Sequence, residues 1–291
     1  MRHNLTKPPE KKTWHKSGVP APRTDSHFAE RRRAERDHRN RVLGPLKTEE
    51  DDVPLRLYGI HAVEAALKNP ARKVLRLVLT ENSERRLLET LGTITHTIER
   101  ATPRDLDKIL GPDAVHQGAM LETEDLPEPE FAALAATANG RPLIVLDQVT
   151  DPHNAGAILR SCAVFGAVGL VMTRRHSPPL TGVLAKSASG ALELIPVALV
   201  QNLSRALADL KAAGFALIGL DGTATAAIED TDWSRPTALV MGAEGKGLRE
   251  LTAKTCDSLA RITTGGPIDS LNVSNAAAIA LHSATMARRR K

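Results

Sequence analysis

Three short segments in the second half of the chain combine polar side chains with glycine in the manner of ligand-binding turns. They read Asp-Pro-His-Asn-Ala-Gly-Ala-Ile-Leu-Arg at 151–160, Gly-Ala-Glu-Gly-Lys-Gly-Leu at 242–248 and Ser-Leu-Asn-Val-Ser at 270–274. Each begins with residues typical of loops and continues into a helical apolar pattern, so each could present polar groups at the end of a strand. Ligands of open α/β sheets bind at that end of the strands.

The first segment has the chemistry of a turn from a strand into a helix. Asn154 is a candidate N-cap, and Arg160 follows it by less than two helical turns, so its guanidinium could point at a group above the sheet edge. Taken alone, the segment favours the simpler interpretation of a capped helix with a solvated arginine.

The second segment is rich in glycine. Gly242, Gly245 and Gly247 allow positive φ and a close approach of the backbone to a ligand. Their spacing is neither the dinucleotide-binding fingerprint nor a P-loop, so a nucleotide phosphate is not the indicated ligand. Glu244 is either a solvated turn acid or a carboxylate that fixes an active-site group.

The third segment, with Ser270 and Asn272, precedes an Ala-rich helical pattern, and either side chain could simply cap that helix. The combination is more informative than any single segment. Three polar turns that all follow apolar runs in one region exceed what helix capping requires, and together they indicate a site.

The elements that would position these turns alternate along the chain. Near-continuous apolar runs predict buried strands at 143–146, 168–172, 193–197, 216–220, 238–241 and 259–262, and helical patterns lie between them at 155–165, 182–189, 203–213, 248–256 and 273–288. Buried strands separated by helices are typical of a largely parallel sheet that is covered on both faces.

The region before this sheet reads as a smaller α/β domain at 53–125. Helices are expected at 60–67, 83–91 and 103–110, and strands at 74–80, 93–99 and 118–122. A Pro- and acid-rich linker at 126–140 would join it to the larger domain at 141–291. Residues 1–52 cannot bury enough apolar surface to fold and are expected to be a disordered basic tail.

The net charge of +5 is unevenly distributed. Residues 1–47 hold 13 Lys/Arg and 5 Asp/Glu, whereas the rest of the chain holds 26 and 29. A basic arm of this kind can bind nucleic-acid phosphates without reading sequence, or can serve only as a solubilising extension. Aromatic residues make up only 2% of the chain, which argues against stacking platforms for single strands.

Other function classes are disfavoured by what the sequence lacks. Cys162 and Cys256 have neither CxxC spacing nor histidine neighbours, so neither a disulfide framework nor a metal site is expected. No apolar run reaches the roughly 20 residues that span a bilayer, and the polar start of the chain does not look like a secretory signal. A cytoplasmic protein with no membrane contact is expected.

In order and content, the three segments resemble the motifs of the SpoU (TrmH-like) RNA 2'-O-ribose methyltransferases, across residues 141–291. Upstream, Tyr58-Gly-Ile-His-Ala-Val-Glu-Ala-Ala-Leu and His116-Gln117-Gly118 resemble the start and end of the L30e-like substrate-binding domain of bacterial 23S rRNA guanosine-2'-O-methyltransferases. The resemblance covers about 240 residues. It implies an S-adenosylmethionine-dependent enzyme acting on RNA, above all 23S rRNA, with a SPOUT-type knotted domain (a deep trefoil knot) and a homodimeric assembly.

The resemblance also implies roles for individual residues. Arg160 would stabilise the developing 2'-alkoxide and the target phosphate, because its guanidinium stays protonated and so cannot accept a proton as the general base. Five residues would hold the cofactor: Gly242, Gly245, Gly247, Ile262 and Leu271. Four would support Arg160: Asn154 and Ser270 position ribose or phosphate, Glu244 orients Arg160 or Asn154, and Asn272 shapes the cofactor loop. The chain departs from the family at 262–269, where Ile-Thr-Thr-Gly-Gly-Pro-Ile-Asp replaces the usual Ile-Pro-Met start.

Three other interpretations remain to be weighed. The same chemistry could act on tRNA, although the separate module at 53–125 favours rRNA. A noncatalytic RNA-binding or ribosome-assembly protein could keep the fold, but it would not need all five polar motif residues. A nicotinamide-dependent oxidoreductase lacks its glycine fingerprint after an early strand.

Overall fold

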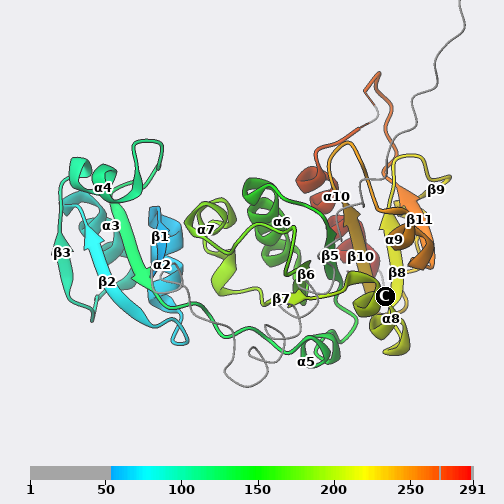
Figure 1. Ribbon diagram of the computed structural model, residues 1–291, viewed down its shortest axis with the longest axis horizontal. Coiled ribbons are helices and arrows are strands. Elements are labelled where there is room, and N and C mark those ends of the chain that lie inside the picture. Colours follow the sequence, from blue (N-terminus) through cyan, green and yellow to red (C-terminus); the bar gives the residue numbers. More distant parts are fainter. Residues whose placement is uncertain (1–53, 269, 290–291) are drawn as a thin grey trace, which may run out of the picture. The chain divides into compact units, whose positions relative to one another are not determined.

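The computed structural model describes residues 54–268 and 270–289 (Figure 1). The tail predicted at 1–52 lies outside the described residues. Within the described part, residues 54–289 belong to one compact unit. No helix in these ranges combines the length and apolar character that crossing a bilayer requires.

The first part of this unit is a four-stranded mixed sheet with three helices. Its elements are β1 (Leu55–Tyr58), α2 (Ile60–Lys68), β2 (Val74–Leu79), α3 (Glu81–Leu91), β3 (Ile98–Arg100), α4 (Pro103–Leu110) and β4 (Ala119–Thr123). The strand order is β1-β4-β2-β3. Strand β4 runs antiparallel to both β1 and β2, whereas β3 is parallel to β2.

Helix α4 shows why this sequence begins a helix where it does. Thr102 accepts a hydrogen bond from the Asp105 backbone, Asp105 accepts one from the Thr102 backbone, and Pro103 occupies the first turn, where its missing N–H costs nothing. The bounds predicted for this helix, 103–110, are confirmed. Gly111 ends the helix with a φ of 91°.

The second part contains a seven-stranded sheet whose strands are all parallel. Its elements are α5 (Phe131–Ala136), β5 (Leu143–Asp147), α6 (Pro152–Phe165), β6 (Gly169–Thr173), α7 (Gly182–Ala188), η2 (Ala191–Glu193), β7 (Val197–Val200), α8 (Leu203–Ala212), β8 (Ala216–Leu220), β9 (Ala226–Ala227), η3 (Ile228–Asp230), β10 (Thr237–Gly242), α9 (Glu250–Thr255), β11 (Ser258–Arg261) and α10 (Val273–Arg289). The strand order is β7-β6-β5-β10-β8-β11-β9. The prediction of a parallel α/β sheet is confirmed.

Alternate residues of the strands pack on opposite faces of this sheet. Ile144 and Leu146 of β5 belong to an apolar cluster with α6, α7 and α10, whereas Leu143 and Val145 belong to a second cluster with α5 and α8. Figure 1 shows these two sets of helices on either side of the strands. Both faces of the sheet are therefore covered, as the unbroken apolar runs predict.

The first of these clusters also contains residues of the four-stranded sheet's domain, including Leu57 and Val63. Gly182 at the start of α7 lies so close to β1 that an added Cβ would meet the Tyr58 ring at 2.7 Å. A buried ion pair joins the same two parts, because Arg72 Nη2 lies 2.7 Å from Glu193 Oε1 and both side chains are at most 3% exposed. Apolar packing and this ion pair thus hold the small domain against the parallel-sheet domain.

Three expectations from the sequence were wrong in detail. The strand predicted at 193–197 begins only at Val197: Glu193 ends a short 3-10 helix, Ala191–Glu193, and Leu194 and Ile195 form a turn. Pro196 has no N–H with which to extend the ladder. The strand predicted at 93–99 is confined to Ile98–Arg100. Asn154 is not the N-cap of α6: Asp151 accepts the capping bond from His153, and Asn154 lies within the first turn.

Candidate active site

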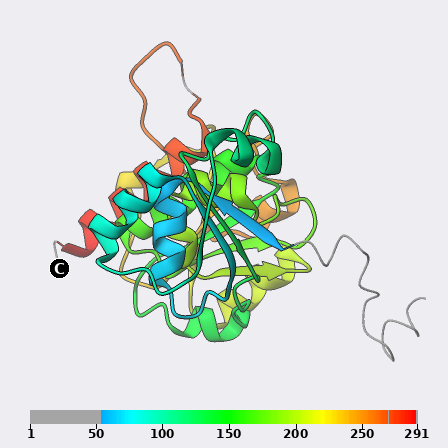
Figure 2. The ribbon, with the colours of Figure 1, turned by 90° about the vertical axis from the view of Figure 1, so that its left-hand side faces the viewer.

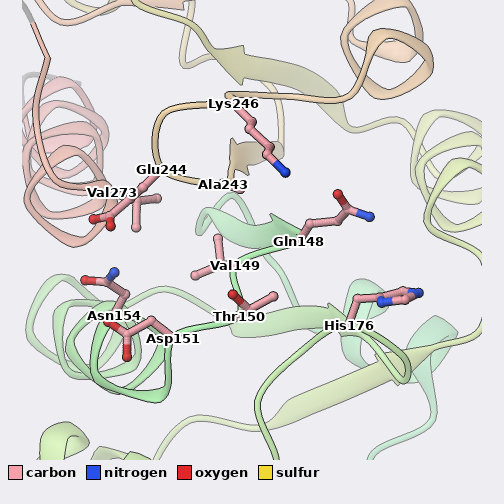
Figure 3. A pocket seen from close by; sticks show the side chains of 10 residues that line it. All are labelled: Gln148, Val149, Thr150, Asp151, Asn154, His176, Ala243, Glu244, Lys246 and Val273. Carbon is pink, nitrogen blue, oxygen red and sulfur yellow. The ribbon is translucent and has the colours of Figure 1, made fainter.

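The three polar turns meet at the carboxyl ends of β5 and β10. These strands are neighbours in the sheet, and the chain leaves β5 toward β6 on the opposite side from β10, so the sheet has its topological switch point here. A pocket of about 320 Å³ opens at this point. Its lining residues are Gln148, Val149, Thr150, Asp151, Asn154, His176, Ala243, Glu244, Lys246 and Val273 (Figure 3).

Three predicted site residues, one from each turn, form a hydrogen-bonded chain. Asn272 donates through Nδ2 to Asn154 Oδ1 at 2.9 Å and to Glu244 Oε1 at 2.5 Å. Asn154 is 7% exposed, so its side chain is fixed inside the first turn of α6. The carboxylate of Glu244 therefore acts on Asn154 through Asn272, and the order of these contacts could not be read from the sequence.

Asn272 serves the fold as well as the site. Its Oδ1 accepts a hydrogen bond from the Ser274 backbone N–H at 2.8 Å, which satisfies a free donor at the start of α10. The same side chain therefore begins the helix and links the other two turns. Capping and site formation, which the sequence offered as alternatives, occur together at this residue.

Arg160 lies apart from this chain of contacts. It is exposed on α6 and outside the pocket lining, and its Nη1 donates to Ser189 Oγ at a long 3.4 Å. Ser189 itself has a left-handed backbone, with a φ of 49°. The guanidinium is thus held loosely on the surface near α7, where a bound polyanion can reach it.

The glycine-rich turn is a closed backbone loop. Ala243 and Gly247 exchange two backbone hydrogen bonds of 3.1 and 2.8 Å, and Gly245 and Gly247 have φ values of 71° and 65°. A Cβ added to Gly242 would overlap the backbone of Gly247 and Leu248, so only glycine fits at the start of the loop. No heavy atom lies within 4 Å of where a Cβ would be at Gly245 or Gly247, apart from their own chain neighbours.

A buried carboxylate anchors the end of this loop. Asp147, the last residue of β5, is fully buried and accepts hydrogen bonds from Arg249 N at 3.1 Å and Arg249 Nε at 2.7 Å. Because a buried charge is tolerated when it is paired and hydrogen-bonded, Asp147 fixes where the chain leaves the loop. This residue was missed in the sequence, although its place directly after four apolar strand residues was a usable signal.

The remaining predicted residues lie around the loop that joins β11 to α10. Ile262 is half-buried against the main apolar cluster, Ser270 is exposed, and Leu271 is 42% exposed. Figure 2 shows part of this loop, in orange, standing out from the helices and strands. Ser270 and Leu271 are thus next to Asn272 in the chain but outside the pocket lining.

Five polar pocket residues were also missed: Gln148, Thr150, Asp151, His176 and Lys246. The first three follow β5, His176 follows β6 and Lys246 follows β10, so their places after strand ends were the available signal. Cys162 takes no part in the pocket. Burial raises the pKa of its thiol to about 12, which makes it a poor nucleophile. No cluster of three or more potential metal-ligating side chains occurs in the described ranges.

The chain matches two family models. Residues 141–282 match the SpoU rRNA Methylase family, and residues 56–129 match the RNA 2'-O ribose methyltransferase substrate binding domain. Among curated proteins, the chain is 37% identical over 244 residues to the 23S rRNA (guanosine-2'-O-)-methyltransferase RlmB of Pseudomonas syringae pv. tomato, covering 81% of this chain and 97% of the relative. RlmB of Photobacterium profundum is 38% identical over 240 residues, with 80% and 97% covered.

Solved structures share the fold. The SpoU methyltransferase AviRb from Streptomyces viridochromogenes, crystallised with the cofactor AdoMet, superposes with a TM-score of 0.71 at 22% identity, covering 89% of this chain and all of that chain. An AdoMet-bound rRNA methyltransferase from Sinorhizobium meliloti gives a TM-score of 0.66 at 22% identity, with 92% and 96% covered. With its motif residues joined at the β5/β10 edge and relatives at 37–38% identity along most of its length, the chain belongs to the SpoU RNA methylase family.

Proposed function

We propose that this protein transfers a methyl group from S-adenosylmethionine to a ribose 2'-hydroxyl of 23S rRNA, at a guanosine. The observation that carries the proposal is the contact chain Glu244–Asn272–Asn154, which joins all three family motifs at one pocket. Relatives that bear this activity in their names match 78–81% of the chain and nearly their own full length, which supports the choice of substrate.

The glycine-rich loop fits the proposed cofactor. When bound, S-adenosylmethionine supplies an electrophilic methyl group on a sulfonium. The open space beside Gly245 and Gly247 and the exposed side chain of Leu271 offer backbone polar groups and apolar surface for an adenosine. Gly242, Ile262 and Leu271 would make the backbone contacts.

The polar chain would position the ribose. Asn154 is held by Asn272, so its amide has a fixed direction into the pocket, and Ser270 lies two residues before Asn272. Arg160 would bind the phosphate of the target nucleotide and stabilise negative charge at the 2'-oxygen. Its loose contact with Ser189 costs little to exchange for a charge-assisted bond to phosphate.

The same chemistry on tRNA is the nearest alternative. The match of residues 56–129 to a substrate-binding domain favours the rRNA enzymes, because curated RlmB proteins align with this chain across that domain as well as the methylase domain. A noncatalytic RNA-binding role is disfavoured, since such a protein has no need of the full contact chain between Glu244, Asn272 and Asn154.

We further propose that the protein acts in the cytoplasm as a homodimer, with a trefoil-knotted methylase domain and an L30e-like fold in the small domain. The packed pair α6 and α10 supports the dimer. Val164, Ile279 and Met286 on these helices are 69%, 37% and 38% exposed, and large apolar side chains exposed on adjacent helices favour a partner surface. Light scattering should find a dimer, and Val164→Glu should shift it toward monomer; a monomeric wild-type protein would contradict the dimer.

The enzymatic proposal is tested by methyl transfer. Tritium from labelled S-adenosylmethionine should enter unmodified 23S rRNA and not tRNA, and mapping should place it on a guanosine ribose. Arg160→Ala should abolish transfer while S-adenosylmethionine binding stays near the wild-type value. Label in tRNA alone would establish the tRNA alternative, absence of label from every RNA would favour the binding protein, and full activity of Arg160→Ala would remove the role given to that residue.

A further inference from the structure

The pocket has two chemically different sides. Figure 3 shows Glu244, Asn154 and Asp151 on one side and Lys246, Gln148 and His176 on the other. The first side carries two carboxylates and the amide held by Asn272. The second carries one ammonium, one carboxamide and one imidazole, all of which can donate hydrogen bonds.

Lys246 is one of two lysines in the described residues that form no ion pair; the other, Lys186, does not line the pocket. Five of these lysines form ion pairs with neighbouring carboxylates, at Lys68, Lys73, Lys108, Lys211 and Lys254. Lys246 has no ion pair within the described ranges, although Glu244 is only two residues away. Since Glu244 is committed to Asn272, the ammonium remains available to a ligand.

The backbone that presents Lys246 is fixed. The residue lies between Gly245 and Gly247, whose positive φ values and the paired backbone bonds of Ala243 and Gly247 set the direction of the turn. In Figure 3 its side chain extends over the pocket toward Gln148. The glycine-rich loop that is proposed to hold the cofactor therefore also carries Lys246. The side chain of this lysine extends into the pocket.

His176 and Gln148 have backbone conformations that residues other than glycine rarely adopt. Their φ values are 64° and 60°, and they are two of only five such residues that the structure describes. At the last residue of β6, the Thr173 hydroxyl donates to the Arg175 carbonyl and lies 3.3 Å from Ser177 Oγ, which closes the turn that carries His176. Backbone strain of this kind concentrates at ligand-binding sites.

We propose that Lys246, His176 and Gln148 form a subsite for an RNA backbone phosphate adjacent to the target ribose. The inference rests on the proposed function. A phosphodiester carries one negative charge and two free acceptor oxygens, which matches one ammonium together with neutral donors. The opposite side of the pocket has Glu244 and Asp151, which repel a phosphate, so an RNA strand has one favourable orientation: phosphate toward Lys246 and ribose toward Asn154.

The subsite is tested with Lys246→Ala in the full-length protein, using unmodified 23S rRNA and labelled S-adenosylmethionine. Loss of one charge-assisted contact should raise KM for RNA about tenfold while kcat changes by less than about threefold. The slope of log affinity for RNA against log salt should fall by about 0.7 to 0.9, the value for one phosphate contact. Lys246→Arg should restore most of the affinity.

Lys254→Ala is the matched control, because it removes the same charge from an exposed residue of α9 outside the pocket. It should leave KM near the wild-type value. His176→Asn, which tolerates a left-handed backbone and keeps a donor, should be milder than His176→Ala. S-adenosylmethionine affinity and the melting temperature of each variant separate a ligand contact from a folding defect.

Several outcomes would overturn the subsite. Equal effects of Lys246→Ala and Lys254→Ala would show that only overall charge matters. Weaker S-adenosylmethionine binding with an unchanged KM for RNA would assign Lys246 to the cofactor's carboxylate instead. If the wild-type protein methylates rRNA and Lys246→Ala has wild-type KM and salt slope, the subsite fails and the proposed function stands. A wild-type protein that binds S-adenosylmethionine but methylates no RNA would reject the proposed function and the subsite with it.

Discussion

The buried ion pair between Arg72 and Glu193 should be a principal contact holding the small domain in place. Glu193 accepts bonds from Arg72 Nη2 at 2.7 Å, Arg72 Nε at 3.2 Å and Asn69 Nδ2 at 2.8 Å. Arg72 also donates to the Glu124 carbonyl at 2.9 Å. Removing the carboxylate would leave a buried guanidinium with one neutral acceptor and no opposing charge.

Glu193→Ala should therefore lower the free energy of unfolding by about 3 to 5 kcal/mol, the usual cost of leaving one half of a buried pair. The side chains of Arg72 and Glu193 are 1% and 3% exposed, so solvent screening does little to reduce this value. The exposed pair Lys254–Glu250, at 70% and 82%, is the matched control. Glu250→Ala should change stability by less than about 1 kcal/mol.

Urea unfolding followed by far-ultraviolet circular dichroism measures both changes. Because the pair joins the small domain to the parallel-sheet domain, Glu193→Ala can also separate the two domains without unfolding either of them. Small-angle scattering and proteolysis within 124–130 would detect that separation. The double variant Arg72→Leu with Glu193→Leu should recover most of the loss, since it removes the unpaired charge. A Glu193→Ala protein within 1 kcal/mol of wild type, with no domain separation, would refute the reasoning.

Three shorter predictions concern other parts of the molecule. Asn272→Ala should lower kcat/KM about thirtyfold, because it removes two hydrogen bonds worth about 1 kcal/mol each, while Asn275→Ala should have little effect. The pKa of Asp105 is lowered to about 2, chiefly by the Thr102 hydroxyl. The stabilisation from Asp105 is therefore present above the unfolded pKa of about 3.9 and lost as pH falls toward 2, and Thr102→Ala should raise that pKa in a carboxyl NMR titration. Deleting residues 1–50 should weaken RNA affinity and flatten its salt dependence, and an unchanged slope would leave these residues without an RNA role.

The sequence predicted the parallel sheet well because both of its faces are buried. Unbroken apolar runs such as 216–220 have no competing interpretation once helices separate them, and the strand at Ala216–Leu220 matches the prediction. Leu194 and Ile195 are also apolar, yet they lie in a turn before β7. Their neighbours explain this: Pro196 cannot donate to a ladder, and the strand begins only after it. Apolar character alone does not place the start of a strand.

The site was partly predictable for a related reason. Polar residues that follow strand ends can be found from the alternating pattern of the sequence, which points to Asn154, Glu244 and Asn272. Which of them touch could not be found, because Asn154 and Asn272 are 118 positions apart and their contact depends on the packing of α6 against α10. Lys246 was hidden for a different reason: an exposed lysine in a turn is unremarkable until its neighbours are known to carry no charge that pairs with it.

The distribution of charge decides which parts of the chain can attract RNA under the proposed function. Residues 54–125 hold 10 Lys/Arg against 11 Asp/Glu, and Arg56, Arg76 and Arg100 are all paired with glutamates. The small domain therefore has little net attraction for phosphate, whatever its shape contributes. The net charge of +8 at residues 1–47 can supply nonspecific affinity for RNA, but it does not select a particular nucleotide. Placing one ribose then depends on a few unpaired cations near the pocket. Removing residues 1–47 should accordingly weaken association most at low salt, whereas removing the Lys246 charge should raise KM for RNA by removing one phosphate contact at the pocket.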